Sequence, residues 1–496
     1  MSGRAAIAAK YIDVLRAGAA PSSEFMSHFE RLVELVRQKL VVIYACLAIP
    51  TGLFLAMTTP PLQTPDAVFH VYRAFQISNG DFVAGRVAGS SGGRVDAALV
   101  ELVNLVFPMA AHADKTYEPA TRAQANSVRW SGRLVDAEFP GSAIYPAYAY
   151  IPQAIAIRVG RALDLPVVRT YTLACVFDLL VSIALTCWAI AIARRTSLAI
   201  FAVGLLPCTL MLFSSVSDEV MMIPACFLLI AYADRFQHDN RLVRTRDLVI
   251  GGALATLCIT ARPPYAGMVL LAFMPGLRFD TAEHTYRLVR RLVAVIVTML
   301  VSFGFIKLFS HAAWAPVAPP RSVSGQMQFL MSNPLGVPVI AWQTFRTWGA
   351  FYWASFVGIL GWLDTQLHPV YYRVAVFPVL LAMLASTFNR RQPRAYAMGD
   401  IGVVLLVGVS CLAMIFGSLY LFWTPVGQMF VDGVQGRYFL GLAPLLALAL
   451  PPLGTRSDKR SRTVAVFAAL CMTAVVVFPV YSYLEVLRAI LNRYYA

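Results

Sequence analysis

Apolar runs long enough to cross a bilayer recur along most of the chain, with short polar segments between them. A spanning helix needs about 20 mostly apolar residues, because each residue advances the helix by only about 1.5 Å. The pattern therefore predicts an all-α polytopic membrane protein with about eleven transmembrane helices. The expected spans are 41–58, 170–193, 197–215, 219–234, 247–261, 264–277, 289–309, 371–388, 400–422, 437–453 and 463–484.

Two segments between the predicted spans are long, namely residues 59–169 and 310–370. Both contain prolines, aromatic residues and amphipathic stretches, so we expect them to fold against the outer membrane surface and to carry interfacial helices. The chain then divides into a cytoplasmic N-terminal segment, a transmembrane module that includes the first long loop, the second long loop and the C-terminal spans. Their expected bounds are 1–40, 41–309, 310–370 and 371–496.

Basic residues gather in every second loop, and this alternation sets the expected orientation. Lys and Arg near helix ends resist translocation, so loops rich in them stay in the cytoplasm. We therefore place these loops and the N-terminus in the cytoplasm and the intervening loops outside. The clusters are Arg194 and Arg195; Arg235, Arg241, Arg244 and Arg246; Arg287, Arg290 and Arg291; Arg390, Arg391 and Arg394; and Arg456, Lys459, Arg460 and Arg462.

Residues 143–163 are apolar enough to pass for another span. A crossing there would turn every later basic cluster outward, which conflicts with the orientation rule. We interpret this stretch as a helix in the outer interface, broken in its first half by Pro146 and Pro152, with Arg158 and Arg161 reaching the headgroups.

Composition narrows the function classes. Only 14% of the residues are charged, and the net charge of +15 comes from basic clusters between apolar runs, so a nucleic-acid surface is not expected. All eight cysteines fall inside apolar runs, which disfavours a disulfide framework or a zinc site. The first apolar run begins too far into the chain for a secretory signal peptide.

The first candidate site lies directly after the first span, where Pro65 is followed by Asp66, His70 and Arg73. Pro65 favours a helix start, with Asp66 in its first turn, and the spacing places the three polar side chains on one helix face. The alternative is an ordinary charged helix face at the headgroup level.

Further charged residues are expected at the outer ends of spans. Asp218 and Glu219 begin a predicted helix at the edge of a span, where a pair of acids usually faces water or a cavity. The structural alternative is that Ser217 and Asp218 cap this helix. Arg262 and Arg437 do not fit the positive-inside pattern. A phosphate suits a guanidinium, whereas lipid headgroups or an internal ion pair are the alternatives.

Three other features stand apart from these ends. Asp178 and Lys307 fall within or near predicted spans and are functional candidates without an assigned partner. Residues 356–364 are expected to form an interfacial helix that ends at the acid Asp364. No nucleotide-binding loop or nucleophile elbow occurs, so the energy for a reaction would come from an activated substrate.

Several of these stretches occur in an order typical of one protein family. They read TPDAVFHVYRAFQISNGDFV, IYPAYAYIPQAIAIRVGRALDLP, SSVSDEV, ARPPYAGMVLLAFMP, FVGILGWLDTQLHP and GVQGRYFLGLAPLL. Together they resemble the DUF2142 family of bacterial polytopic membrane proteins, which is similar in layout to the GT-C glycosyltransferases. The resemblance runs from about residue 40 to the C-terminus.

The resemblance implies a GT-C-like enzyme in the bacterial inner membrane that moves a sugar from a polyprenyl-phosphate carrier to a glycan or glycolipid acceptor at the outer face. Asp66 occupies the position of the catalytic base in such enzymes. Many relatives read Pro-Asp-Glu there, whereas Ala67 follows the acid in this chain, so a single-carboxylate mechanism is implied.

We assign roles to the remaining candidate residues from the requirements of an inverting transfer, which needs a base for the attacking hydroxyl and cations for the departing phosphate. Arg262, Tyr265 and Arg437 are candidates for binding the donor phosphate. His70 and Asp218 are candidates for orienting the acceptor or the base, and Asp66 and Asp218 for holding a divalent metal such as Mg²⁺ or Mn²⁺. The alternatives are a transporter of polyprenyl-linked lipid or polysaccharide and a non-catalytic assembly partner.

Overall fold

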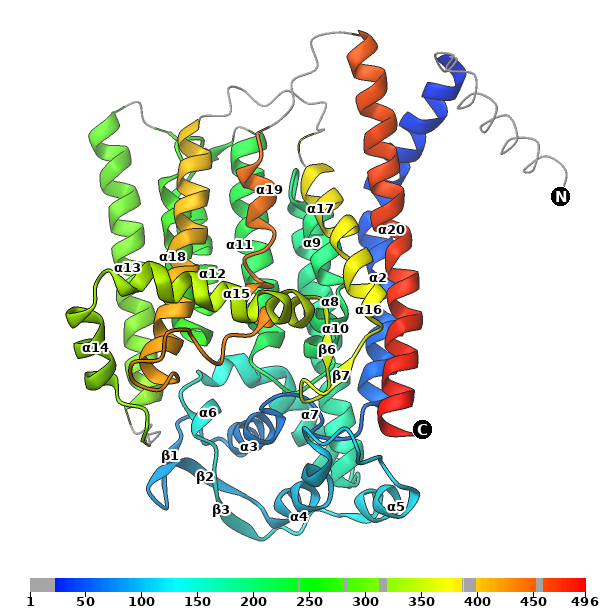
Figure 1. Cartoon of the computed structure of the whole chain (residues 1–496), viewed down its shortest axis with the longest axis vertical. Helices are drawn as coiled ribbons and strands as arrows, with labels where there is room; N and C mark the ends of the chain where they lie inside the picture. The colour runs from blue at the N-terminus through cyan, green and yellow to red at the C-terminus, as the bar shows by residue number, and fades with distance from the viewer. Residues whose placement is uncertain are drawn as a thin grey trace, which may run out of the picture.

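Long, nearly parallel helices form the main body of the molecule (Figure 1). The computed structural model describes residues 23–239, 241–280, 283–311, 319–385, 387, 398–451 and 458–496. Within these residues, five helices are long and apolar enough to span a membrane. They are α2 (Ser23–Thr58), α8 (Val167–Ile192), α13 (His284–Ser310), α18 (Met398–Phe422) and α20 (Asp458–Tyr494). The protein is therefore a predominantly helical, multi-pass membrane protein.

Two further expected spans are continuous α-helices, three are broken, and one is a short 3₁₀ helix. The continuous ones are α11 (Glu219–Asp239) and α12 (Thr245–Ala261). The expected span 197–215 corresponds to α9 (Ser197–Gly204) and α10 (Pro207–Phe213), and 264–277 corresponds to the 3₁₀ helix η3 (Pro263–Phe273). The span 371–388 corresponds to α16 (Pro369–Val374) and α17 (Val376–Ala385). The span 437–453 corresponds to the 3₁₀ helix η5 (Gly436–Phe439) and α19 (Leu445–Ala449). Two of the breaks coincide with prolines, since Pro207 begins α10 and Pro444 precedes α19, and a proline lacks the N–H that would bond to the preceding turn.

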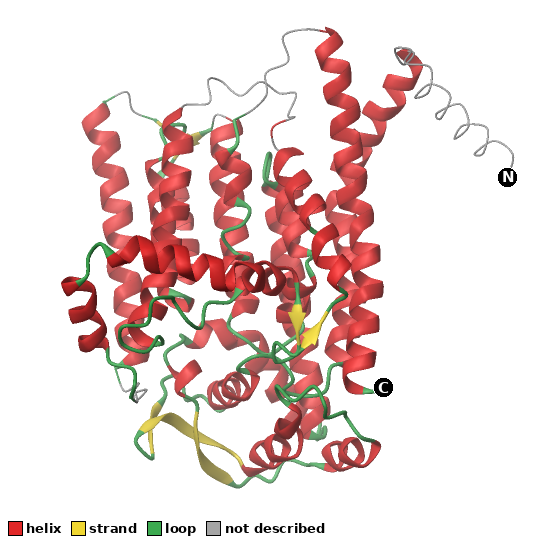
Figure 2. Cartoon of the chain, in the orientation of Figure 1, coloured by secondary structure: helices red, strands yellow, loops and turns green. Residues whose placement is uncertain are grey.

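The first long loop folds into a cap over one end of the bundle (Figure 1). Its elements are α3 (Ala67–Ser78), β1 (Gly85–Val87), β2 (Ser90–Asp96), α4 (Ala97–Val106), η1 (Phe107–Met109), α5 (Pro119–Ser127), β3 (Leu134–Glu138), α6 (Pro140–Ala143), η2 (Ala147–Tyr150) and α7 (Ile151–Ala162). The three strands form one antiparallel sheet in the order β1-β2-β3, with Gly92 opposite Glu138 (Figure 2). The sequence pattern did not predict this sheet.

The doubtful segment 143–163 contains no helix of spanning length. Its longest helix, α7, has 12 residues, about 18 Å, and packs against α3 and α8. Arg161, which is expected to reach the headgroups, contacts other residues of the cap. Its guanidinium donates to Asn79 and lies 5.1 Å from the centre of the Phe75 ring.

The second long loop differs from its prediction in one part. Its helices are α14 (Val323–Ser332) and α15 (Gly336–Val357), and α15 crosses the bundle nearly at right angles to the long helices (Figure 1). The helix expected over residues 356–364 is wrong, because α15 ends at Val357 and a hairpin of β6 (Ile359–Leu360) and β7 (Thr365–Gln366) follows. Gly358 and Gly361 have positive φ angles of 158° and 62°, which ends the helix and permits the turn.

The described basic clusters gather at the end of the bundle away from the cap. Arg194 forms an ion pair of 2.8 Å with Asp239, and Arg290 pairs with Asp280. Strand β4 (Leu242–Val243) pairs in parallel with β5 (Arg278–Phe279) at this same end (Figure 2). The last two basic clusters lie largely outside the residues whose side chains are described. The alternation of charge that the sequence shows thus corresponds to one basic end of the molecule.

Candidate functional site

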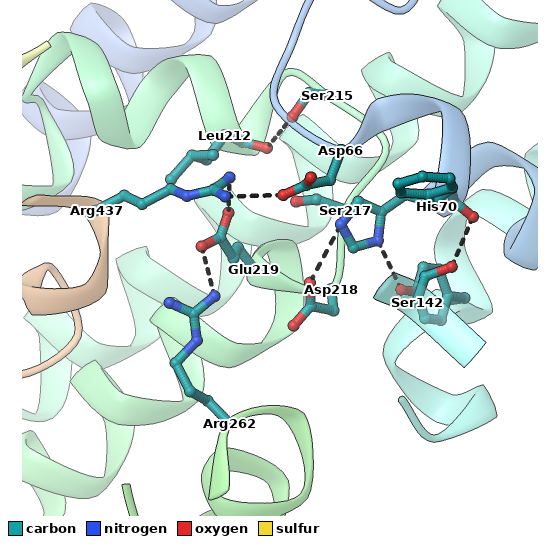
Figure 3. A network of polar contacts seen from close by, with 12 residues as sticks. Asp66, His70, Ser142, Leu212, Ser215, Ser217, Asp218, Glu219, Arg262 and Arg437 are labelled. Carbon is teal, nitrogen blue, oxygen red and sulfur yellow. Dashed lines mark hydrogen bonds and ion pairs between the residues drawn. The ribbon is translucent and has the colours of Figure 1, made fainter. Parts of the chain in front are cut away.

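Acids and arginines from distant parts of the chain meet where the cap joins the bundle (Figure 3). Arg437 Nη2 donates to Asp66 Oδ2 at 2.9 Å, and Arg437 Nη1 lies 3.6 Å from Glu219 Oε2. The other oxygen of Glu219 accepts from Arg262 Nη2 at 2.8 Å. Asp66, Arg437, Glu219 and Arg262 therefore form one chain of alternating charges, which we call the acid–arginine site.

Asp66 is the most accessible member of the acid–arginine site. Its side chain is 47% exposed, whereas those of Glu219 and Arg437 are 2% and 8% exposed. Helix α3 begins at Ala67, so Asp66 lies just before the helix rather than in its first turn as expected. Its φ of 61° is left-handed, and its side chain makes no cap hydrogen bond. The carboxylate is consequently turned towards Arg437 and towards solvent.

The expected polar face of α3 is divided between two environments. His70 lies beside Asp218, as described below, whereas Arg73 is completely buried. Arg73 donates to Gln76 at 2.5 Å and to the Phe82 carbonyl at 2.7 Å. Arg73 therefore holds the cap together and does not face the acid–arginine site.

Close backbone packing holds Arg437 in place. The amide of the preceding Gly436 donates to Ser355 Oγ in α15 at 2.8 Å, and a side chain at Gly436 would collide with the backbone of Tyr352 and Phe356. Tyr265, expected to bind the donor, is fully buried and donates its hydroxyl to the Tyr438 carbonyl at 2.8 Å. Tyr265 thus supports the segment that carries Arg437 and does not reach into the site.

A second pair lies beside the acid–arginine site. His70 Nε2 is 3.8 Å from Asp218 Oδ1, and His70 Nδ1 lies 2.7 Å from the Tyr150 hydroxyl. Burial lowers the pKa of His70 to about 4, although Asp66 and Glu219 oppose the shift. His70 is therefore neutral at physiological pH and acts here as a hydrogen-bonding group rather than as a cation.

The two aspartates experience opposite electrostatic effects. Burial acts to raise the pKa of Asp66, but the charges of Arg437 and Arg262 outweigh it and hold that pKa below its usual value. Burial and the adjacent Glu219 raise the pKa of Asp218 to about 7. Asp66 is thus ionised at neutral pH, whereas Asp218 exchanges its proton in that range.

Helix capping does not explain Ser217 and Asp218. Neither the Ser217 hydroxyl nor Asp218 Oδ2 has a hydrogen-bond partner among the described residues. The backbone carbonyl of Asp218 accepts from Met221 and Met222 instead. Two unpaired acceptors therefore remain available beside the acid–arginine site.

Both arginines keep donor capacity and charge. Arg262 Nη1 and Arg437 Nε have no hydrogen-bond partner among the described residues. Burial acts to lower the pKa of each guanidinium, but Glu219 outweighs it and raises both pKa values above the usual one. An anion at this site would meet permanently charged donors.

Comparison with known proteins places these residues in a family. A family model described as a predicted membrane protein, DUF2142, matches residues 50–446. The chain belongs to the DUF2142 family. No curated protein and no solved structure matches it. The resemblance to DUF2142 expected from the ordered motifs is confirmed, and the match spans every residue of the acid–arginine site.

The side chains of this DUF2142 protein do not fit the divalent metal considered from sequence. Within the described residues, no three His, Cys, Asp or Glu side chains lie close enough to hold an ion. Asp66 and Glu219 already face arginines, and Asp218 faces His70. We therefore assign no step to a metal.

Two candidates from the sequence lie outside the site. Lys307 is in the last turn of α13, with its ammonium 5.7 Å from the centre of the Phe303 ring. Asp178 is buried in α8, where it forms no ion pair with any of the described residues. Glu219, by contrast, bridges both arginines of this DUF2142 protein, although the sequence analysis names it only as the neighbour of Asp218 and gives it no role. Its position next to Asp218 and the presence of two outer arginines without an assigned partner could have indicated that Glu219 belongs to the site.

Proposed function

We propose that the protein is a membrane glycosyltransferase that moves a sugar from a polyprenyl-phosphate carrier to a glycan or glycolipid acceptor. The observation that carries this proposal is the accessible carboxylate of Asp66 at 2.9 Å from Arg437, which Glu219 links to Arg262. An inverting transfer needs these two kinds of group side by side, a base for the acceptor hydroxyl and cations for the departing phosphate.

In this proposal Asp66 takes the proton of the attacking hydroxyl while Arg437 and Arg262 bind the phosphate oxygens. The sugar–phosphate bond breaks as the glycosidic bond forms. Negative charge grows on the phosphate next to Arg262 Nη1 and Arg437 Nε, which have no hydrogen-bond partner among the described residues. His70 and Asp218 would orient the acceptor beside Asp66.

The ion pair between Asp66 and Arg437 also suggests how donor binding would activate the base. In the structure Arg437 helps to keep the pKa of Asp66 low, which makes this carboxylate a weak base. A phosphate that shares the Arg437 guanidinium would weaken this effect and raise the proton affinity of Asp66. The base would then be strong only when the donor is bound.

The proposal includes an orientation in the bacterial inner membrane. The basic end of the bundle and the N-terminus would face the cytoplasm, and the cap and the acid–arginine site would face outward. About eleven crossings in a GT-C-like arrangement would leave room for the lipid tail of the carrier between helices. The reactive carbon would then lie at the interface, close to Asp66.

The first prediction tests Asp66 directly. Asp66→Asn keeps the shape of the side chain but cannot take a proton, so we expect transfer to fall by about 10²- to 10⁴-fold. The measurement is transfer of labelled sugar in membranes, after mass spectrometry of the co-purifying lipid has identified the donor. Asp81→Asn, at an exposed acid of the same loop, is the matched control and should retain activity.

Full transfer by Asp66→Asn would contradict the proposal. Movement of carrier-linked sugar across proteoliposomes without new glycosidic bonds would identify a transporter instead. Unchanged function in variants of all the outer acids would favour a non-catalytic assembly partner.

A further inference from the structure

Asp178 is a buried acid that the proposed reaction does not use. It lies within the spanning helix α8 and has no exposed surface. Neither carboxylate oxygen has a hydrogen-bond partner among the described residues. No Lys, Arg or His of the described residues forms an ion pair with it or acts on its charge.

The surroundings of Asp178 are polar but uncharged. Its polar neighbour across the helix interface is Gln153 of α7. On α8 itself, Cys175 lies one turn before it, and Ser182 one turn after it donates to the Val220 carbonyl at 2.9 Å. This face of α8 therefore packs behind the turn that carries Asp218 and Glu219.

Gln153 connects Asp178 to that turn. Its Nε2 donates to the Ser217 carbonyl at 2.8 Å, while its Oε1 has no partner among the described residues. Gln153 Oε1 and the two oxygens of Asp178 all lack a hydrogen-bond partner among the described residues, and a proton on Asp178 would give two of these acceptors a shared hydrogen bond. An unpaired charge in a low-dielectric interior is far more costly than a neutral carboxyl, and each unsatisfied buried acceptor adds to that cost.

We propose that Asp178 keeps its proton in the folded protein and donates it to Gln153 Oε1. The pair then fixes the Ser217 backbone and makes Asp178 and Gln153 positioning residues for Asp218 and Glu219. This positioning role depends on the proposed function, whereas the protonated state of Asp178 does not.

Asparagine and alanine at position 178 test the donated hydrogen bond. Asp178→Asn keeps the shape and supplies an N–H to Gln153, so we expect its unfolding temperature to stay within about 2 °C of the unmodified protein. Asp178→Ala removes the donor and leaves a cavity, so we expect a fall of several degrees.

Asp96 offers a matched control, because it is a buried acid whose side chain accepts hydrogen bonds rather than donating one. It is 1% exposed, and its oxygens accept from the backbone amides of Ala98, Ser131 and Gly132 at 2.8–3.1 Å. Both carboxylate oxygens of Asp96 accept hydrogen bonds from backbone amides. In Asp96→Asn the side-chain NH₂ group would replace one of these oxygens and would point its N–H at a backbone N–H. We expect Asp96→Asn to lower the unfolding temperature by several degrees. An Asp178→Asn variant as unstable as Asp96→Asn would overturn the proposal.

Infrared spectroscopy tests the proton itself without any assay of transfer. We expect a carboxylic-acid C=O band that persists from pH 5 to pH 9 in the unmodified protein and is missing in Asp178→Asn. The difference between the two spectra separates this band from that of Asp218. Absence of the band, or its loss by pH 8, would overturn the proposal.

Transfer assays then test the positioning role. Asp178→Ala should lower transfer at least about tenfold and change its pH profile, because the turn that carries Asp218 loosens, whereas Asp178→Asn should retain both. Equal activity in all three proteins would overturn the positioning role. A protein without transferase activity that still shows the persistent band would contradict the proposed function and leave the protonated Asp178 intact.

Discussion

Asp66 and Asp218 lie in the same small site, yet their surroundings give them opposite proton affinities. The guanidinium of Arg437 stabilises the charged form of Asp66, whereas Asp218 is buried next to Glu219 and has no hydrogen bond on Oδ2. A site with one carboxylate that is ionised at neutral pH and one that exchanges its proton near pH 7 can separate the role of base from that of an uncharged hydrogen-bond donor.

The second prediction concerns the pH dependence that Asp218 brings to stability. Its pKa in the folded protein is about 7, above the usual value of 3.8, so the folded form holds the proton more tightly than the unfolded form. Its contribution to the free energy of unfolding is therefore fully present below about pH 4 and is lost as the pH rises through 7. Asp218→Asn cannot titrate and should remove this loss.

The measurement is thermal unfolding of both proteins in the same detergent at pH 5 and pH 8.5. We expect Asp218→Asn to gain stability relative to the unmodified protein between the two values, by up to a few kcal/mol. Asp81→Asn should show no such gain. A difference between Asp218→Asn and the unmodified protein that does not change with pH would show that Asp218 is ionised throughout this range.

The sequence predicted part of this site because charge at the end of an apolar run is costly and needs a reason. That argument identified Asp66, Asp218, Arg262 and Arg437, and the structure places all of them together. It could not assign partners, because pairing depends on how distant helices approach. Arg262 pairs with Glu219, to which the sequence analysis gave no role, and Tyr265 contacts the Tyr438 backbone.

At the scale of elements, η5 is held closely against α15, and this contact sets the position of Arg437. Gly436 is needed there because any side chain would meet the backbone of Tyr352 and Phe356, and backbone cannot move aside as a flexible side chain can. Its amide also donates to Ser355. The reach of Arg437 towards Asp66 thus depends on a glycine that takes no part in the chemistry.

The third prediction is that Gly436→Ala disturbs both fold and activity. Overpacking of this kind costs about 1–3 kcal/mol, and the displaced η5 would move Arg437 away from Asp66. We expect a lower unfolding temperature and a raised KM for the donor. Gly402→Ala in α18 is the control, because no atom lies near its added methyl group and alanine favours a helix. Normal transfer by Gly436→Ala would show that the position of Arg437 does not depend on the contact between Gly436 and α15.

Element boundaries were predictable where hydrophobicity alone decides them. The expected run 170–193 corresponds to α8 (Val167–Ile192), and 400–422 to α18 (Met398–Phe422). The expected run 197–215 failed because Pro207 begins a new helix inside it. The sheet of the cap was missed because its strands are short and rich in glycine. Glycine is needed at position 92, because a side chain there would collide with the Ala137 backbone of the facing strand.

At the scale of the whole molecule, the C-terminal end of α20 connects both long loops. Arg493 pairs with Asp364 at 2.7 Å and donates to the carbonyls of Met109, His112 and Lys115 in the cap. These partners are far apart in the sequence, and no periodic pattern relates them. The arrangement could not be predicted from hydrophobic runs, although it holds the cap against the end of the bundle.

The last prediction follows from the burial of this ion pair. The side chains of Arg493 and Asp364 are 5% and 6% exposed, so Arg493→Ala would leave a buried carboxylate and three carbonyls without their partner. Breaking a buried pair in this way costs about 3–5 kcal/mol. We expect a clear loss of thermal stability and faster proteolysis within residues 59–169, because the cap loses its attachment to α20.

Arg488→Ala provides the control on the same helix. Arg488 is 44% exposed and pairs with Glu485 at 3.0 Å, and such exposed pairs contribute about 0–1 kcal/mol. Equal stability of the two variants would mean that the cap is held by its apolar contacts with α8 rather than by Arg493. Loss of stability in Arg493→Ala alone, with cleavage confined to the cap, would show that the two long loops depend on one arginine to stay above the site.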